Sequence, residues 1–84
     1  MSTEYAKWDR VNKLAAELLL MEPVSPERPK VLGSLLSALD ACNDKTAAKL
    51  LETLEGGGGD TPENLEQIRK VARRILEVIH FSET

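Results

Sequence analysis

The chain has few of the residues that carry chemistry or crosslinks. It contains one cysteine, Cys42, and one histidine, His80, among its 84 residues. A lone cysteine excludes an intrachain disulfide and favours a reducing, cytoplasmic setting, although Cys42 can still pair between two chains. One cysteine and one histidine cannot supply a zinc site of the usual kind, and no acidic loop resembles a calcium site. We therefore expect no metal and no cofactor.

The sequence also lacks any grouping of residues typical of an active site. A general base needs a positioned partner, and His80 has none that the spacing identifies. Its place near the end of a predicted helix instead favours an interaction with the helix dipole. We expect a protein that is not an enzyme.

Long apolar runs and an excess of positive charge are absent as well. No apolar run approaches the roughly 18 residues that span a bilayer, and the first residues lack the blocks of a signal peptide. We expect a soluble protein with no membrane partner. The formal net charge of −3 gives no general attraction to phosphates, so we also expect no nucleic-acid partner.

Aliphatic residues, by contrast, are abundant and recur at three- and four-residue steps, and no alternating strand pattern is present. This periodicity predicts an all-α fold with helices over about 3–21, 28–42, 45–55 and 62–80. Short connections predict a small, largely antiparallel four-helix bundle, which we interpret as one helical domain over 1–84.

The predicted helix ends have recognisable signals. Ser25 is a candidate cap for the second helix, Asn43 can end it, and Asp44 can cap the third. Thr61 is followed by proline and opens the fourth helix. Gly33 lies early in the second helix, where its small size could permit a close helix crossing.

Four consecutive glycines, Gly56 to Gly59, separate the third and fourth helices and predict a flexible loop. A glycine tract before a helix resembles a phosphate cradle, but no Gly-Lys-Ser or Gly-Lys-Thr follows it, and Asp60 and Glu63 add negative charge. The tract also suits an engineered linker, so the origin of the chain, natural or designed, stays open.

The first helix points to a partner. Leu20 and Met21 widen its apolar stripe beyond one face, so the surplus is covered either by the other helices or by a second molecule. Aromatic residues are common anchors at interfaces, which makes Tyr5 and Trp8 candidates, although Trp8 can equally be a core residue. We expect a protein–protein interaction module, an adaptor, inhibitor or self-associating subunit, whose partner is another protein or a second copy.

The last predicted helix carries one dense basic cluster: Arg69, Lys70, Arg73 and Arg74. Glu66 and Glu77 are spaced to pair with Lys70 and Arg73, which leaves a solvated face as one interpretation. The alternatives are the rim of a protein interface, with an acidic protein as its ligand, and nucleic-acid binding.

A second alternative comes from a resemblance. The acidic composition, four predicted helices and the segment Gly33-Ser34-Leu35 resemble an acyl carrier protein, whose serine holds a phosphopantetheine arm. The resemblance implies Ser34 as the attachment site. Gly33 stands where that family has aspartate, and the residues after Ser34 include only one acid, Asp40, where carriers are acidic.

Overall fold

The computed structural model describes residues 3–56 and 58–83, and this part of the chain forms four helices and no strand. Helix α1 covers Thr3–Leu20, α2 Arg28–Cys42, α3 Lys45–Gly56 and α4 Pro62–Glu83. The predicted all-helical bundle is confirmed. Helix α1 ends one residue before the predicted Met21, whereas α4 continues past the predicted end at His80.

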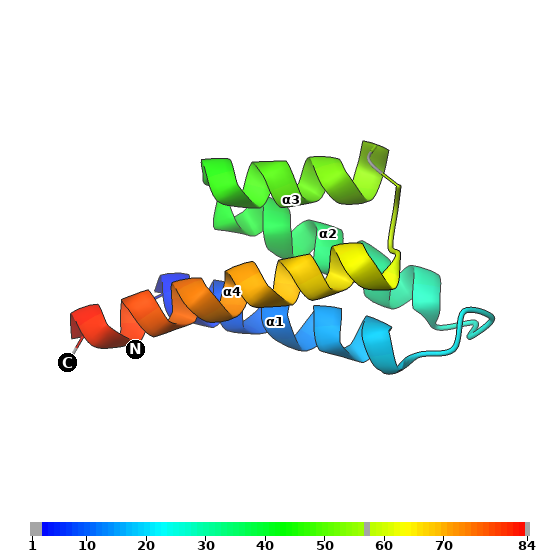
Figure 1. The fold of residues 1–84 in the computed structure, drawn as a ribbon, viewed down its shortest axis with the longest axis horizontal. Coiled ribbons are helices and arrows are strands. Elements are labelled where there is room, and N and C mark those ends of the chain that lie inside the picture. Colours follow the sequence, from blue (N-terminus) through cyan, green and yellow to red (C-terminus); the bar gives the residue numbers. More distant parts are fainter. Residues whose placement is uncertain (1–2, 57, 84) are drawn as a thin grey trace.

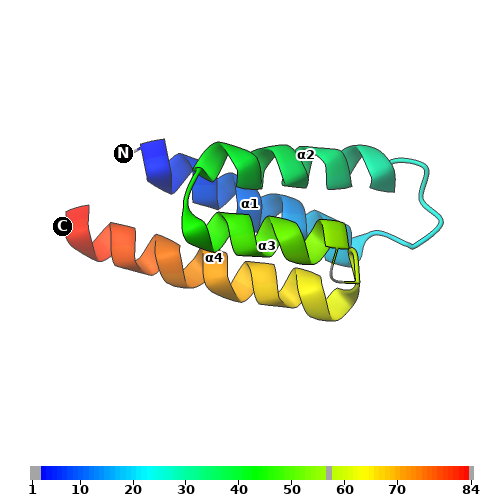
Figure 2. The same ribbon diagram turned by 90° about the horizontal axis from the view of Figure 1, so that it is seen from above.

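Successive helices run in opposite directions, and the molecule is elongated, with extents of 42 × 22 × 19 Å (Figure 1). Helix α1 packs extensively against both α2 and α4. Helix α3 lies mainly on α2 and touches α4 only slightly (Figure 2). We call the side with the α1–α2 and α3–α4 connections the loop end, and the side with the start of α1 and the finish of α4 the terminal end.

The core is formed by the apolar stripes that the periodicity predicts. It excludes water almost completely, and burial of this kind is the main favourable term in folding. Its buried members are Trp8, Val11, Ala15, Leu18, Leu35, Ala38, Leu39, Ala47, Leu50, Leu54, Leu65, Ile68 and Ala72.

The two helix boundaries around residue 43 follow the sequence signals. Asn43 adopts the left-handed conformation, with φ of 50°, and ends α2. The backbone N–H of Ala47 donates to Asp44 Oδ1 at 2.7 Å, so Asp44 caps α3. At the start of α4, the N–H of Asn64 donates to Thr61 Oγ1 at 3.3 Å. These three predictions are confirmed.

The predicted cap of α2 is wrong. The N-cap residue is Glu27, which makes no side-chain capping bond, and Pro29 lies in the first turn. The N–H of Ser25 donates to the carbonyl of Glu22, and the Ser25 carbonyl accepts from the N–H of Arg28. Ser25 therefore belongs to the turns that connect α1 and α2. A proline in the first turn removes one donor that would otherwise need a partner, which lessens the need for a cap.

The glycines differ in what they require. Gly58 and Gly59 have φ of 119° and 76°, values that L side chains rarely adopt, and the Gly59 carbonyl accepts from Asn64 Nδ2 at 2.7 Å. Gly57 of the predicted flexible loop lies outside the described residues. Gly33 has no atom within 4 Å of an added Cβ, so the predicted close helix crossing is absent there.

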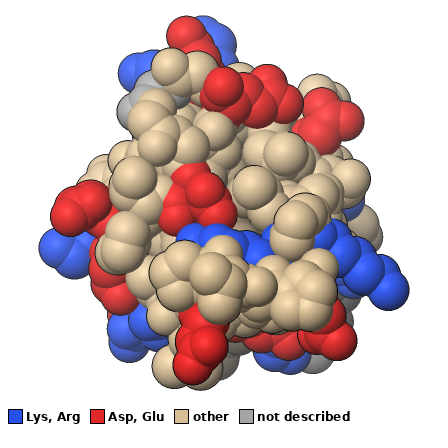
Figure 3. Space-filling view, turned by 90° about the vertical axis from the view of Figure 1, so that its right-hand side faces the viewer, with Lys and Arg blue, Asp and Glu red and all other residues tan. Residues whose placement is uncertain are grey.

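Arg28 joins three separate parts of the chain at the loop end. Its Nε and Nη2 donate to Asp60, at 2.9 Å to Oδ2 and 3.1 Å to the carbonyl oxygen, and its Nη1 donates to the carbonyl of Leu18 at 3.0 Å. The guanidinium thus links the last turn of α1, the start of α2 and the α3–α4 connection. Figure 3 views this end and shows acidic and basic side chains interspersed over it.

Candidate functional site

The two predicted aromatic anchors have different positions. Trp8 is only 3% exposed and belongs to the core, which is the alternative that the sequence left open, and its role as an anchor stays a prediction. Its large ring is buried among the apolar side chains of the core and leaves little surface for a partner. Tyr5 is partly exposed and lines an open hollow of about 590 Å³ at the terminal end with Leu76, Glu77, His80 and Phe81.

The apolar end of α1 is split between core and surface. Leu20 is 88% exposed, whereas Met21 is partly buried against the core. Val24, in the connector that follows, is 85% exposed. The apolar stripe of α1 predicts Leu20 and Met21, whereas Val24 lies between Pro23 and Pro26, outside any helical stripe, so periodicity does not reveal it. Leu20 and Val24 form the loop-end apolar pair.

The basic cluster on α4 does not act as one face. Lys70, Arg73 and Arg74 are exposed, but Arg69 is partly buried, and its Nε has no hydrogen-bond partner among the described residues. The predicted pairing with Lys70 is wrong, since the acid involved, Glu66, lies 3.6 Å from Arg69 Nη1 instead. The exposed cations Lys70, Arg73 and Arg74 thus lie on a part of α4 that also carries the exposed acids Glu66 and Glu77.

The second half of α4 carries exposed apolar side chains that the sequence analysis did not identify beside Arg73 and Arg74. Helix α4 has 22 residues and its neighbour α3 only 12, so the later turns of α4 extend beyond α3 (Figure 2). Val78 and Phe81 lie on those turns and are 61% and 77% exposed. The available signal was that Val78 falls outside the inner stripe of α4, but its exposure depends on how far α3 reaches.

A shallow groove lies between α3 and α4, and we call it the α3–α4 groove. It has a volume of about 350 Å³. Its floor holds Leu50 and Val71, and its walls are polar or basic. The lining residues are Lys45, Thr46, Lys49, Leu50, Thr53, Gln67 and Val71. No acid is among them.

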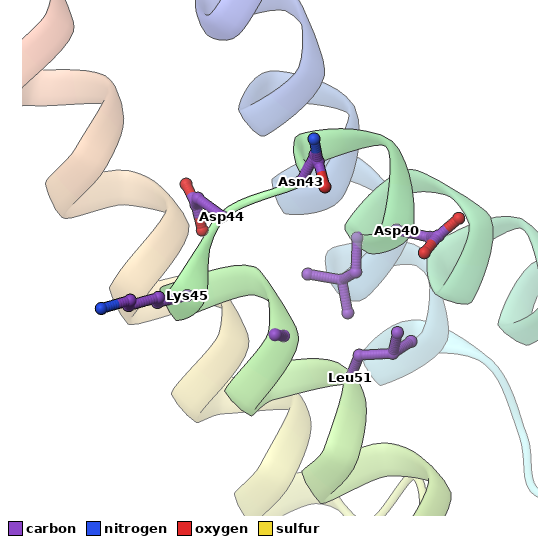
Figure 4. A pocket seen from close by; sticks show the side chains of 7 residues that line it. Asp40, Asn43, Asp44, Lys45 and Leu51 are labelled. Carbon is purple, nitrogen blue, oxygen red and sulfur yellow. The ribbon is translucent and has the colours of Figure 1, made fainter.

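Another hollow, of about 380 Å³, lies beside the turn between α2 and α3 (Figure 4). Asp40 and Asn43 come from the end of α2, Asp44 and Lys45 from the start of α3, and Leu51 points toward the space between the helices. Asp44 already accepts a backbone hydrogen bond as the cap of α3. Within the described chain, no group of three or more His, Cys, Asp or Glu side chains could hold a metal ion.

Two residues singled out for chemistry lie on α2. Ser34 is partly buried in the second turn of the helix, well inside its start at Arg28. The carrier alternative that names Ser34 stays a prediction. Cys42 is partly buried near the turn, and burial, together with the negative charge of Asp44, raises the pKa of its thiol to about 11. Cys42 is therefore protonated, and a weak nucleophile, at neutral pH.

None of the helices in the described residues combines the length and hydropathy that crossing a lipid bilayer requires.

Comparisons with known proteins identify no relative of this chain. No protein-family model, no curated protein and no solved structure matches the chain.

Proposed function

We propose that the protein is a small helical protein–protein interaction module that acts without catalysis, as an adaptor, inhibitor or self-associating subunit. The observation that carries the proposal is the side of the second half of α4 that α3 leaves uncovered, where Val78 and Phe81 are exposed on adjacent turns. Large apolar side chains that cluster on a surface are typical of an area that another molecule covers.

The surroundings of Val78 and Phe81 support an interface of ordinary composition. Partly buried Leu76 and Tyr5 lie beside Phe81 and extend the apolar area, while Arg73 and Arg74 lie one turn before Val78. An apolar centre with a polar rim is the usual arrangement of a specific interface. The loop-end apolar pair is a second exposed apolar area, at the opposite end of the molecule.

The single free cysteine, Cys42, leads us to propose a cytoplasmic location as well, because reduced thiols persist there.

The experiment compares charge insertion at the two ends. Val78→Glu and Phe81→Glu place a carboxylate in the proposed surface, and Val24→Glu and Leu20→Glu are the matched changes at the loop end. Molar mass is measured by light scattering over a range of concentrations, and proteins captured from cells on each immobilised variant are identified. Far-UV circular dichroism checks that the helices remain.

We expect Val78→Glu and Phe81→Glu to lower the mass of a self-associated species, or to abolish capture of a protein that Val24→Glu still captures. A wild-type chain that stays monomeric, and that captures nothing the α4 variants fail to capture, contradicts the proposal. Loss confined to Val24→Glu and Leu20→Glu would move the interface to the loop end.

A further inference from the structure

We infer that the α3–α4 groove binds an acidic amphipathic helix of a partner protein. The inference rests on the proposed interaction function and names the partner's chemistry. Three features of the groove lead to it: the sign of its charge, the apolar strip along its floor, and its length.

The charge of the groove is opposite to that of the protein. The chain carries a net charge of −3, yet the groove has two lysines, Lys45 and Lys49, and no acid in its lining. Neither lysine makes an ion pair with any described residue. The nearest acids lie outside the groove: Asp44, the cap of α3, shares the hollow beside the α2–α3 turn with Lys45, and Glu52 shares a neighbouring hollow with Lys49. The lysines are therefore free to contact carboxylates of a bound chain.

The floor of the groove continues along one face of α4 as a strip that holds Val71 and Val78, with exposed Arg74 between them. Leu50 and Val71 form the floor, and Val78 lies seven residues after Val71, which places both on the same face of α4. Val78 is 61% exposed because α3 begins near the level of Val71 and does not reach it. The strip thus starts inside the groove and ends on the open surface of the proposed interface.

The length of the strip suits a helix. From Gln67 to Val78 the axis of α4 advances about 16 Å, which is about three helical turns. Two roughly antiparallel helices form the walls, so the groove is straight, as a docked helix requires. Apolar residues at i, i+3, i+4 and i+7 of a bound helix would cover the floor and Val78, and acids beside them would face Lys45 and Lys49.

A nucleic acid fits these features less well. Sequence-tolerant binding of single strands uses aromatic side chains for stacking, and the groove lining contains none. The apolar floor also offers no positive charge to the phosphates of a nucleic-acid backbone. Thr53 adds no free donor, because its hydroxyl donates to the carbonyl of Lys49 at 3.0 Å.

The test uses synthetic peptides of about 14 residues, slightly longer than the strip. The first has leucine at i, i+3, i+4 and i+7 with glutamate on both flanks. The second replaces each glutamate by lysine, and the third keeps the glutamates but replaces each leucine by serine. Fluorescence anisotropy gives Kd at about 50 mM and about 500 mM salt, and a single-stranded oligonucleotide is measured alongside.

The variant is Lys45→Glu/Lys49→Glu, and Lys13→Glu/Lys30→Glu is its control, since it changes net charge equally at exposed lysines outside the groove. We expect only the acidic leucine peptide to bind, about 10-fold more weakly to the groove variant than to the control and more weakly at high salt. Circular dichroism verifies folding. Lys45→Gln/Lys49→Gln, which only neutralises the groove, should give a smaller loss.

Equal binding of the acidic and basic peptides, equal losses in the two double variants, or binding of the oligonucleotide alone overturns the inference. If the acidic peptide does not bind while Val78→Glu still disrupts an interaction, the groove assignment is wrong and the proposed function stands. If Val78→Glu also has no effect, both are wrong.

Discussion

The two ends of the molecule are held together by different forces. At the loop end, Arg28 forms hydrogen bonds to Leu18 and Asp60, and Asn64 forms another to Gly59. At the terminal end, the helices meet through apolar side chains such as Trp8, and their unequal lengths leave Val78 exposed. Directional bonds fix the connections of the chain at the loop end, whereas apolar packing alone joins the helices at the terminal end, and both ends keep exposed apolar side chains.

The largest expected effect comes from Trp8→Ala at the terminal end. Removing a buried indole leaves a cavity, and we expect a loss of about 3 to 5 kcal/mol in the free energy of unfolding, measured by urea denaturation. Leu20→Ala at the loop end is the comparison, with an expected change within about 0.5 kcal/mol because Leu20 is 88% exposed. Similar losses for the two variants would show that Leu20 is covered, for example by a second copy.

The next largest effect on stability tests the hydrogen bonds of Arg28 at the loop end. Arg28→Met keeps the aliphatic stem but removes the donors to Asp60 and Leu18, and we expect a loss of about 1 to 2 kcal/mol, since both charged groups retain some solvent exposure. Asp60→Asn should cost less. A double-mutant cycle that finds no coupling between residues 28 and 60 would contradict the assigned role.

A pair of glycine substitutions should have effects of opposite sign. Gly58→Ala forces a side chain into φ of 119°, and we expect it to cost about 1 kcal/mol or more. Gly33→Ala lies in a helix with open space around it, and we expect a gain of about 0.5 to 1 kcal/mol from helix propensity. Thermal unfolding of both variants measures the difference. A loss of stability on Gly33→Ala would contradict this expectation and would indicate that another molecule covers the open surface at Gly33.

The smallest effect on stability at neutral pH concerns Cys42. Its pKa of about 11 makes the thiol slower to react with iodoacetamide at pH 8 in the folded protein than in urea. Because the folded state favours the protonated thiol, this contribution to stability is complete below pH 9, the ordinary pKa, and is lost as the pH rises through about 11. Cys42→Ala supplies the baseline, and equal alkylation rates in both states would contradict the raised pKa.

Features that depend on neighbouring residues were predictable from the sequence. The cap at Asp44, the left-handed Asn43 and the apolar stripes each follow from a few positions within one or two turns. The hydrogen-bonded ion pair between Arg28 and Asp60 was not predictable, because 32 residues separate the partners and nothing local distinguishes this arginine from the others. The exposure of Val78 likewise depends on where α3 begins in space.

The proposed surfaces divide in the same way. Tyr5, Leu20 and Met21 were named from the composition of the first helix. In the structure Leu20 is exposed, Met21 is partly buried, and Tyr5 lies partly buried at the terminal end. Trp8 shows the limit of such reasoning, since an aromatic residue on an apolar stripe has the same pattern whether it anchors a partner or fills a core. The α3–α4 groove required the relative placement of two helices, which periodicity alone does not give.

The slight contact between α3 and α4 has a mechanical consequence. Since α3 is attached chiefly to α2, the two helices form an antiparallel hairpin that meets the rest of the bundle mostly through α2. Widening the α3–α4 groove therefore breaks few contacts, whereas moving α2 would break its extensive packing against α1. The spacing between α3 and α4 is thus the dimension of the bundle that costs least to change, and it can adjust while α1, α2 and α4 keep their mutual packing.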